Sequence, residues 1–254
     1  GEPPAISHAS FSESNLCRFD KGNVMREIYG KQVYDSLEEL VAPIHTALVI
    51  VDMQNDLVSP GGLVDRNGTA LEGNRAIIEP LRLLLKGARR GGVLITYVLY
   101  TIQPGLPTAS PAWIYEGMRL FRGTDLSPAR EGISSLEGLF EGTWGWEVIP
   151  ELAPRPEDIL VRKHHLGAFW DTNLDKILRG NGIETVVVTG TATSGCVFDT
   201  AVGSAAHDYY TVFVRDCVTS IDSAPHELGI DLLSRRYPGP TSDDLLKVWN
   251  PTDM

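Results

Sequence analysis

The sequence predicts an α/β fold in which helices cover both faces of a parallel β-sheet, a three-layer Rossmann-like arrangement. Short apolar runs alternate with stretches of helical periodicity between residues 47 and 235. The apolar runs are continuous, which is typical of strands that are buried on both faces. An alternation of strand and helix produces right-handed crossovers and therefore a parallel sheet.

Five apolar runs are the expected strands. The first, at residues 47–52, ends in the carboxylate of Asp52, and the others lie at 93–99, 158–162, 185–189 and 211–215. Helices are expected at residues 74–90, 172–179, 196–207 and 225–235, with a short one near 36–40. In the 74–90 stretch, Ile77, Leu81 and Leu84 recur at helical spacing, and Gly91 and Gly92 end the helix.

The chain is expected to form a single domain over residues 1–254, with two additions. Residues 1–46 form an N-terminal arm of mixed, proline-containing sequence. Residues 101–147 form a lid-like insertion that is rich in Gly, Pro, Ser and aromatic residues. A loop this long inside a compact domain is usually functional or mobile.

Composition narrows the choice of partner and compartment. A formal net charge of −11 argues against nucleic acid and anionic membranes, though not against a small anionic substrate. The three cysteines, Cys17, Cys196 and Cys217, make a poor disulfide framework and fit a reducing compartment. The sequence lacks both a secretory signal pattern and an apolar run of the ~20 residues that span a bilayer. We therefore expect a cytoplasmic protein; Cys17 and Cys217 are interpreted as structural.

Three reactive side chains lie at strand ends. Asp52 ends the first strand, Lys163 follows the strand that finishes at Arg162, and Cys196 follows the strand at 185–189. Ligands of open parallel sheets bind outside the carboxyl ends of the strands, so these side chains are expected to lie close together. A cysteine at a helix start is expected to have a lowered thiol pKa, and unpaired N–H groups there could hold an oxyanion.

Each of these residues also has a structural interpretation. Asp52 could cap a turn, Lys163 could be a solvated surface lysine, and Cys196 could be a small buried apolar residue. The combination favours a nucleophile at Cys196. A metal site at His164 and His165 is disfavoured, because adjacent residues of an extended chain point to opposite faces.

At these residues the sequence resembles the isochorismatase-like cysteine hydrolases, from about Ala47 to about Ser220. The resemblance rests on three ordered motifs: residues 47–56 with Pro60-Gly-Gly62, Lys163 followed by Gly167-Ala-Phe-Trp-Asp-Thr172, and Val188-Thr-Gly-Thr-Ala-Thr-Ser-Gly-Cys196. It implies a parallel sheet sandwiched by helices and the catalytic triad Cys196, Asp52 and Lys163. It also implies a non-proline cis peptide at Thr191–Ala192, with the N–H groups of Ala192 and Cys196 forming an oxyanion hole.

Within this family the match is closest in style to the ureide and amide hydrolases: N-carbamoylsarcosine amidohydrolase, ureidoacrylate amidohydrolase and biuret hydrolase. Nicotinamidases carry metal-binding histidines after the second strand, whereas this chain has Tyr100-Thr-Ile-Gln-Pro104 there and no histidine between His45 and His164. Isochorismatases that cleave vinyl ethers lack the cysteine. No metal and no cofactor is expected, and the protein is expected to be a homo-oligomer, a dimer or tetramer.

The leading hypothesis is hydrolysis of the C–N bond in a small, uncharged or anionic amide or ureide through a thioester, with release of ammonia or an amine. A nicotinamidase-like or ester-cleaving hydrolase and a non-catalytic binding protein remain as alternatives. Candidate substrate-binding residues are Gln54, Phe169, Trp170, Thr191, Trp113 and Tyr115, with Trp144 as a further wall. Core packing is the alternative for each aromatic residue, and a hydrogen bond to the backbone is the alternative for Gln54. Arg119 and Arg122 are more readily explained as solvated than as ligands for a carboxylate.

Overall fold

The computed structural model describes residues 25–107, 109–119 and 138–250. Strands in these ranges are β1 Arg26–Ile28, β2 Lys31–Val33, β3 Thr46–Val51, β4 Leu94–Tyr100, β5 Ile159–Lys163, β6 Thr185–Thr191 and β7 Tyr210–Thr219. Helices are α1 Leu37–Leu40, α2 Asn55–Val58, α3 Leu63–Arg66, α4 Glu72–Ala76, α5 Ile78–Gly91, α6 Pro111–Arg119, α7 Leu174–Gly180, α8 Cys196–Ala206, α9 Ser223–Ser234 and α10 Ser242–Trp249. Single 3₁₀ turns lie at Pro43–His45 and Pro150–Leu152.

All five strands expected from the apolar runs belong to one parallel sheet, with the order β5-β4-β3-β6-β7. Every residue of β3 and of β6 is buried, as a strand covered on both faces requires. The chain builds the sheet outward from β3 through β4 to β5, and then returns to the other side of β3 for β6 and β7. The strand order therefore reverses between β3 and β6, where parallel sheets bind ligands.

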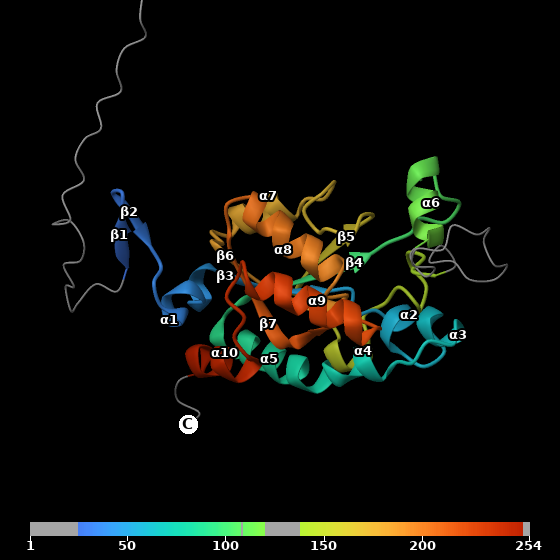
Figure 1. The fold of residues 1–254 in the computed structure, drawn as a ribbon, viewed down its shortest axis with the longest axis horizontal. Helices are drawn as coiled ribbons and strands as arrows, with labels where there is room; N and C mark the ends of the chain where they lie inside the picture. The colour runs from blue at the N-terminus through green and yellow to red at the C-terminus, as the bar shows by residue number, and fades with distance from the viewer. Residues whose placement is uncertain (1–24, 108, 120–137, 251–254) are drawn as a thin grey trace, which may run out of the picture. The chain divides into compact units, whose positions relative to one another are not determined.

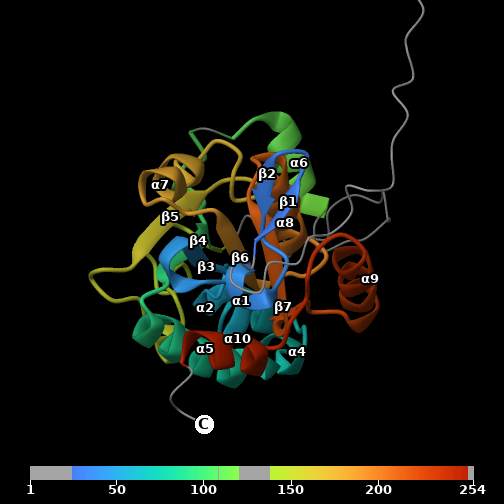
Figure 2. The ribbon, with the colours of Figure 1, turned by 90° about the vertical axis from the view of Figure 1, so that its left-hand side faces the viewer.

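Helices cover the sheet in two layers (Figures 1 and 2). Helices α7 and α8 lie on one face, and α5 and α10 lie on the other. On the α7–α8 face, Val49 and Val51 pack in one cluster with Leu178, Val197 and Ala201. The alternate residues of β3 point to the opposite face. The predicted three-layer fold is confirmed.

The expected helix at 74–90 is two helices, α4 and α5, which meet at Ile77. The end of α5 follows the prediction: Gly92 adopts φ 79°, and the N–H of Val93 donates to Ala88 O at 3.0 Å. Helix α10 was missed, although Thr241 and Asp244 form a capping box at its start. Among the helices that the structure describes, none combines the length and hydrophobicity needed to cross a bilayer.

Contacts divide the chain into two units, residues 1–39 and 40–254. In the described part of the first unit, β1 and β2 pair antiparallel around a turn at Tyr29 and Gly30, both with positive φ. The arm was expected to end at residue 46, which is the first residue of β3. The single-domain assignment remains a prediction.

The insertion at 101–147 is described only in part, and residues 108 and 120–137, with Arg122, lie outside the described ranges. Its last segment, 138–147, is bound to the body of the fold: Asp56 N donates to Gly145 O, and Leu139 N donates to Asp56 Oδ2. Gly145 has to be glycine, because a Cβ there would lie 2.1 Å from the Asp56 carboxylate. These bonds attach residues 138–147 to α2.

Candidate active site

Asp52 is held at the end of β3 by the neighbouring strand β4. Its N–H donates to Val98 O at 2.9 Å, and its Oδ1 accepts a hydrogen bond from Tyr100 N at 2.8 Å. The residue has φ 53°, an uncommon conformation for a residue other than glycine that aspartate tolerates better than most. Only 1% of the surface of Asp52 is exposed, so its carboxylate is buried at the edge of the sheet.

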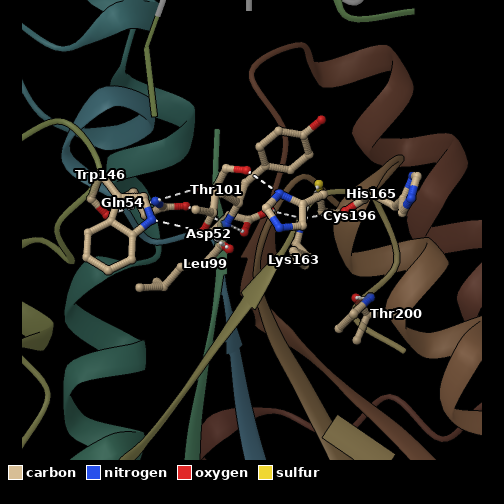
Figure 3. A network of polar contacts seen from close by, with 12 residues as sticks. Asp52, Gln54, Leu99, Thr101, Trp146, Lys163, His165, Cys196 and Thr200 are labelled. Carbon is tan, nitrogen blue, oxygen red and sulfur yellow. Dashed lines mark hydrogen bonds and ion pairs between the residues drawn. The ribbon is translucent and has the colours of Figure 1, made fainter. Parts of the chain in front are cut away.

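Lys163 reaches this carboxylate from two strands away. It is the last residue of β5, opposite Tyr100 of β4, and its Nζ passes 4.5 Å from the centre of the Tyr100 ring. The ammonium lies 2.8 Å from Asp52 Oδ2, 3.3 Å from Cys196 Sγ and 3.2 Å from His165 O (Figure 3). The contacts with Cys196 and His165 are hydrogen bonds, and the contact with Asp52 is an ion pair. Lys163 is completely buried, which removes the surface interpretation.

The electrostatics of the pair follow from this packing. Burial lowers the pKa of Lys163, but the negative charge of Asp52 and the contact with Cys196 outweigh it and raise the pKa above its usual value. Lys163 is therefore positively charged and supplies a fixed positive charge next to the thiol.

Cys196 begins α8, directly after the loop that follows β6. Burial raises the pKa of its thiol from the usual 9.0 to about 12; Lys163 opposes this shift, and Asp52 adds to it. The expectation of a lowered thiol pKa at the helix start is therefore wrong, because burial and the charge of Asp52 raise the pKa by more than Lys163 lowers it. At rest the residue is a neutral thiol beside an Asp52–Lys163 ion pair.

The loop before Cys196 is closed by its own backbone. The Thr191–Ala192 peptide is cis, as the resemblance implied. Ala192 O accepts hydrogen bonds from Gly195 N at 2.9 Å and Val197 N at 3.0 Å. Neither Ala192 N nor Cys196 N donates to an acceptor within the described ranges, so both N–H groups are available to a ligand.

Residues outside the predicted set support this loop. Thr193 N donates to Thr219 O at 2.7 Å, and Thr193 Oγ1 lies 2.9 Å from His226 Nδ1 of α9. Ser194 N donates to Ser220 Oγ at 3.3 Å. No sequence pattern pointed to Ser220 or His226, because they are distant from the loop in the chain and contact it only in the folded protein.

Gly190 allows the two central strands of the sheet to approach each other closely. It has φ 105°, and a Cβ at this position would lie 2.1 Å from Val51 O. Its absent side chain therefore lets β6 approach β3 closely at the point where the β6–β7 register shifts. It brings the two strands that carry Asp52 and Cys196 together.

Two of the six candidate substrate-binding residues are used inside the protein. Gln54 is fully buried, and its Nε2 donates to Tyr100 O at 3.1 Å and Trp146 O at 2.8 Å, so both amide hydrogens bind backbone (Figure 3). Phe169 is 6% exposed and stacks on His207 with ring centres 4.9 Å apart. The structure places both in the packing rather than at an open surface.

The other four are placed differently from one another. Thr191 is 3% exposed and donates to Asn74 Oδ1 at 3.4 Å. Trp113 Nε1 donates to His164 O at 2.7 Å, which brings α6 to the segment after Lys163. Trp170 and Tyr115 are about half exposed, as is Trp144. A substrate-binding role for these residues stays a prediction.

Among the described residues, no group of three His, Cys, Asp or Glu side chains could hold a metal ion. His164 Nδ1 lies 2.8 Å from Thr101 O. Its neighbour His165 contributes its backbone carbonyl to Lys163.

Comparisons with known proteins fit this geometry. A family model described as the isochorismatase domain matches residues 46–242, which include Asp52, Lys163 and Cys196. The ureidoacrylate amidohydrolase RutB of Agrobacterium fabrum is 34% identical over 201 residues, covering 76% of this chain and 81% of that protein. The solved N-carbamoylsarcosine amidase from Thermoplasma acidophilum is 29% identical, with a TM-score of 0.59, over 78% of this chain and 96% of that one. A cysteine hydrolase from Pseudomonas syringae pv. phaseolicola, 20% identical, shares the fold with a TM-score of 0.69 over 84% of this chain and 95% of that one.

Proposed function

The chain belongs to the isochorismatase family of hydrolases, and from this we propose that it is a cysteine amidohydrolase acting on a small amide or ureide through a thioester on Cys196. The observation that carries the proposal is the contact of one buried ammonium, Lys163 Nζ, with both the Asp52 carboxylate at 2.8 Å and the Cys196 sulfur at 3.3 Å. A nucleophile, a proton acceptor and a fixed positive charge then meet at one point.

The first half-reaction forms the thioester. Because the thiol has a pKa of about 12, its proton moves to Asp52 as Sγ attacks the substrate carbonyl. Lys163 stabilises the negative charge that develops on sulfur, and the Ala192 and Cys196 N–H groups bind the oxyanion. Asp52 then donates the proton to the leaving nitrogen as the C–N bond breaks.

The second half-reaction restores the enzyme. Asp52 takes a proton from a water molecule, which attacks the thioester carbonyl and forms a second oxyanion. The C–S bond then breaks, the acid product leaves, and the proton returns to Cys196. The two half-reactions use the carboxylate, the ammonium of Lys163, the thiol, water and the two backbone donors.

Two features support a small amide or ureide. The matched relatives named above bear the names of an amidohydrolase and an amidase that act on compounds with a carbamoyl group. Asp52 and Lys163 are 1% and 0% exposed, so a substrate meets the site only at the partly exposed Cys196 and the adjacent backbone. We take this limited exposure of the reactive groups as support for a small substrate.

The test combines trapping with a substrate panel. The panel contains carbamoyl amino acids, ureidoacrylate, biuret, nicotinamide, an aryl amide and a peptide library, assayed for ammonia or amine release, and an ester, assayed for alcohol release. We expect turnover of at least one amide or ureide, and a mass adduct on Cys196. Cys196→Ala should lose both, whereas Cys217→Ala, which removes a buried thiol elsewhere, should keep both. Turnover of the ester alone, efficient peptide cleavage, or an active Cys196→Ala protein would overturn the proposal.

A further inference from the structure

We propose that Asp199 is a specificity-determining residue of this site, and that its negative charge favours uncharged substrates over anionic ones. The proposal rests on the proposed function, because it concerns which amides or ureides reach Cys196. It narrows the substrate class, since the sequence alone allowed both uncharged and anionic compounds.

The position of Asp199 follows from the start of α8. Cys196 is the first residue of the helix and Asp199 the fourth, and residues three apart lie on neighbouring positions of a helix surface, with Cβ atoms about 5–6 Å apart. Helical side chains lean toward the helix N-terminus. The carboxylate of Asp199 therefore leans over the turn that holds Gly195 and Cys196.

The buried face of α8 does not include Asp199. Val197, Thr200, Ala201 and Ser204 are the buried residues that pack inward, whereas Asp199 is partly exposed, as Cys196 is. The space over Gly195 is open: an added Cβ there would meet no atom closer than Ala192 O at 4.0 Å. Asp199 thus borders the side from which a substrate approaches the thiol.

The carboxylate of Asp199 is not neutralised by a direct partner. It makes no hydrogen bond or ion pair with any residue in the described parts of the chain. Burial raises the pKa of Asp199, and the positive charge of Lys163 opposes the shift. This influence of Lys163 agrees with the position of Asp199 in the first turn of α8.

This placement has a consequence for substrate charge. Lys163 is already paired with Asp52, so a substrate carboxylate near the mouth of the site would meet a second negative charge. An unpaired unit charge about 6 Å away, at an effective dielectric constant of about 40, changes a rate by about tenfold. Uncharged ureides, whose N–H groups donate hydrogen bonds, are favoured by a carboxylate acceptor.

The first experiment needs no substrate. The rates at which iodoacetate and iodoacetamide, an anionic and an uncharged reagent of similar size, alkylate Cys196 are measured by peptide mass mapping. The ratio of the two rates cancels any change in the fraction of thiolate. Asp199→Asn should raise the iodoacetate-to-iodoacetamide ratio by about tenfold. Asp199→Glu, which keeps the charge, and Asp243→Asn, which removes an exposed carboxylate on α10, should leave the ratio within about twofold of the wild-type value.

The second experiment measures kcat/KM for 3-ureidopropionate and for its uncharged amide, 3-ureidopropanamide. Asp199→Asn should raise the value for the anion by about tenfold and leave that for the amide within about twofold. An unchanged alkylation ratio in a folded Asp199→Asn protein, or an equal change in Asp243→Asn, would overturn the role of Asp199 even if ureides are hydrolysed. If the ratio changes as expected but the wild-type protein forms no acyl adduct and hydrolyses no ureide, the proposed function fails and the charge effect at Cys196 stands.

Discussion

Replacing Lys163 with methionine tests the electrostatic arrangement most directly. The substitution keeps the length of an unbranched side chain in a completely buried position and removes the ammonium. It leaves the Asp52 carboxylate without the contact at 2.8 Å, and Cys196 Sγ without the contact at 3.3 Å. Of the two oxygens of Asp52, only Oδ1 would keep a hydrogen bond, from Tyr100 N at 2.8 Å.

The size of the effect follows from burial. Removing one partner of a buried ion pair leaves an uncompensated charge and lowers the free energy of unfolding by about 3–5 kcal/mol. With a urea m-value of about 2–3 kcal/mol/M, the unfolding midpoint should fall by about 1–2 M. The matched control is Lys247→Met, which breaks an ion pair with Asp244 whose side chains are 58% and 43% exposed. Lys247→Met should lower the free energy of unfolding by at most about 1 kcal/mol.

The assay is urea unfolding of a double-mutant cycle. Asp52→Asn, Lys163→Met and the double variant are compared with the wild-type protein. The double variant buries no unpaired charge. Its decrease in the free energy of unfolding should therefore be smaller than the sum of the two single decreases by at least about 2 kcal/mol. All three variants should lack turnover. The buried ion pair would be refuted if the two single decreases in the free energy of unfolding added up to that of the double variant. A decrease below about 1 kcal/mol in Lys163→Met would refute it as well.

Four further predictions follow, two on the thiol, one on the strand contact and one on the metal. Because burial raises the pKa of Cys196 from 9.0 to about 12, its alkylation by iodoacetamide should keep accelerating above pH 9, and a plateau there would contradict the shift. The thiol of Cys196 loses its proton at lower pH in the unfolded chain than in the folded one. The free energy of unfolding should therefore fall as the pH rises from 9.0 toward about 12, which unfolding followed by fluorescence would measure. Gly190→Ala should destabilise the protein by about 1–3 kcal/mol or more in urea unfolding, because its Cβ would overlap Val51 O, whereas Gly180→Ala, with open space at the end of α7, should be neutral or stabilising. Dialysis against a chelator should leave turnover unchanged, and recovery with added zinc or manganese after a loss would show that the cysteine mechanism is incomplete.

The sequence was sufficient for the sheet and for the catalytic candidates. Continuous apolar runs predicted β3 to β7, because a strand buried on both faces has no polar side to alternate with. The same runs placed Asp52, Lys163 and Cys196 at strand ends, and the carboxyl ends of parallel strands share one edge. The buried, mutually contacting side chains agree with that inference.

Local patterns were less informative where elements are short. Helices α2 and α3 have four residues each, too few for a helical period to emerge. The break between α4 and α5 at Ile77 could not be predicted from the sequence, because apolar residues continue at helical spacing across it. Helix α10 did have a signal in its capping box, so that omission was avoidable.

The chain alone determined which chemical groups are available and at which edge of the sheet they gather, because periodicity and strand order are written in neighbouring residues. Only the tertiary structure decided what those groups experience. It directed Gln54 and Phe169 into the packing, and it raised the pKa of Cys196 where the helix start had suggested the opposite. Loss of solvation depends on every segment that surrounds a side chain, and those segments are distant in sequence, so no local pattern records it.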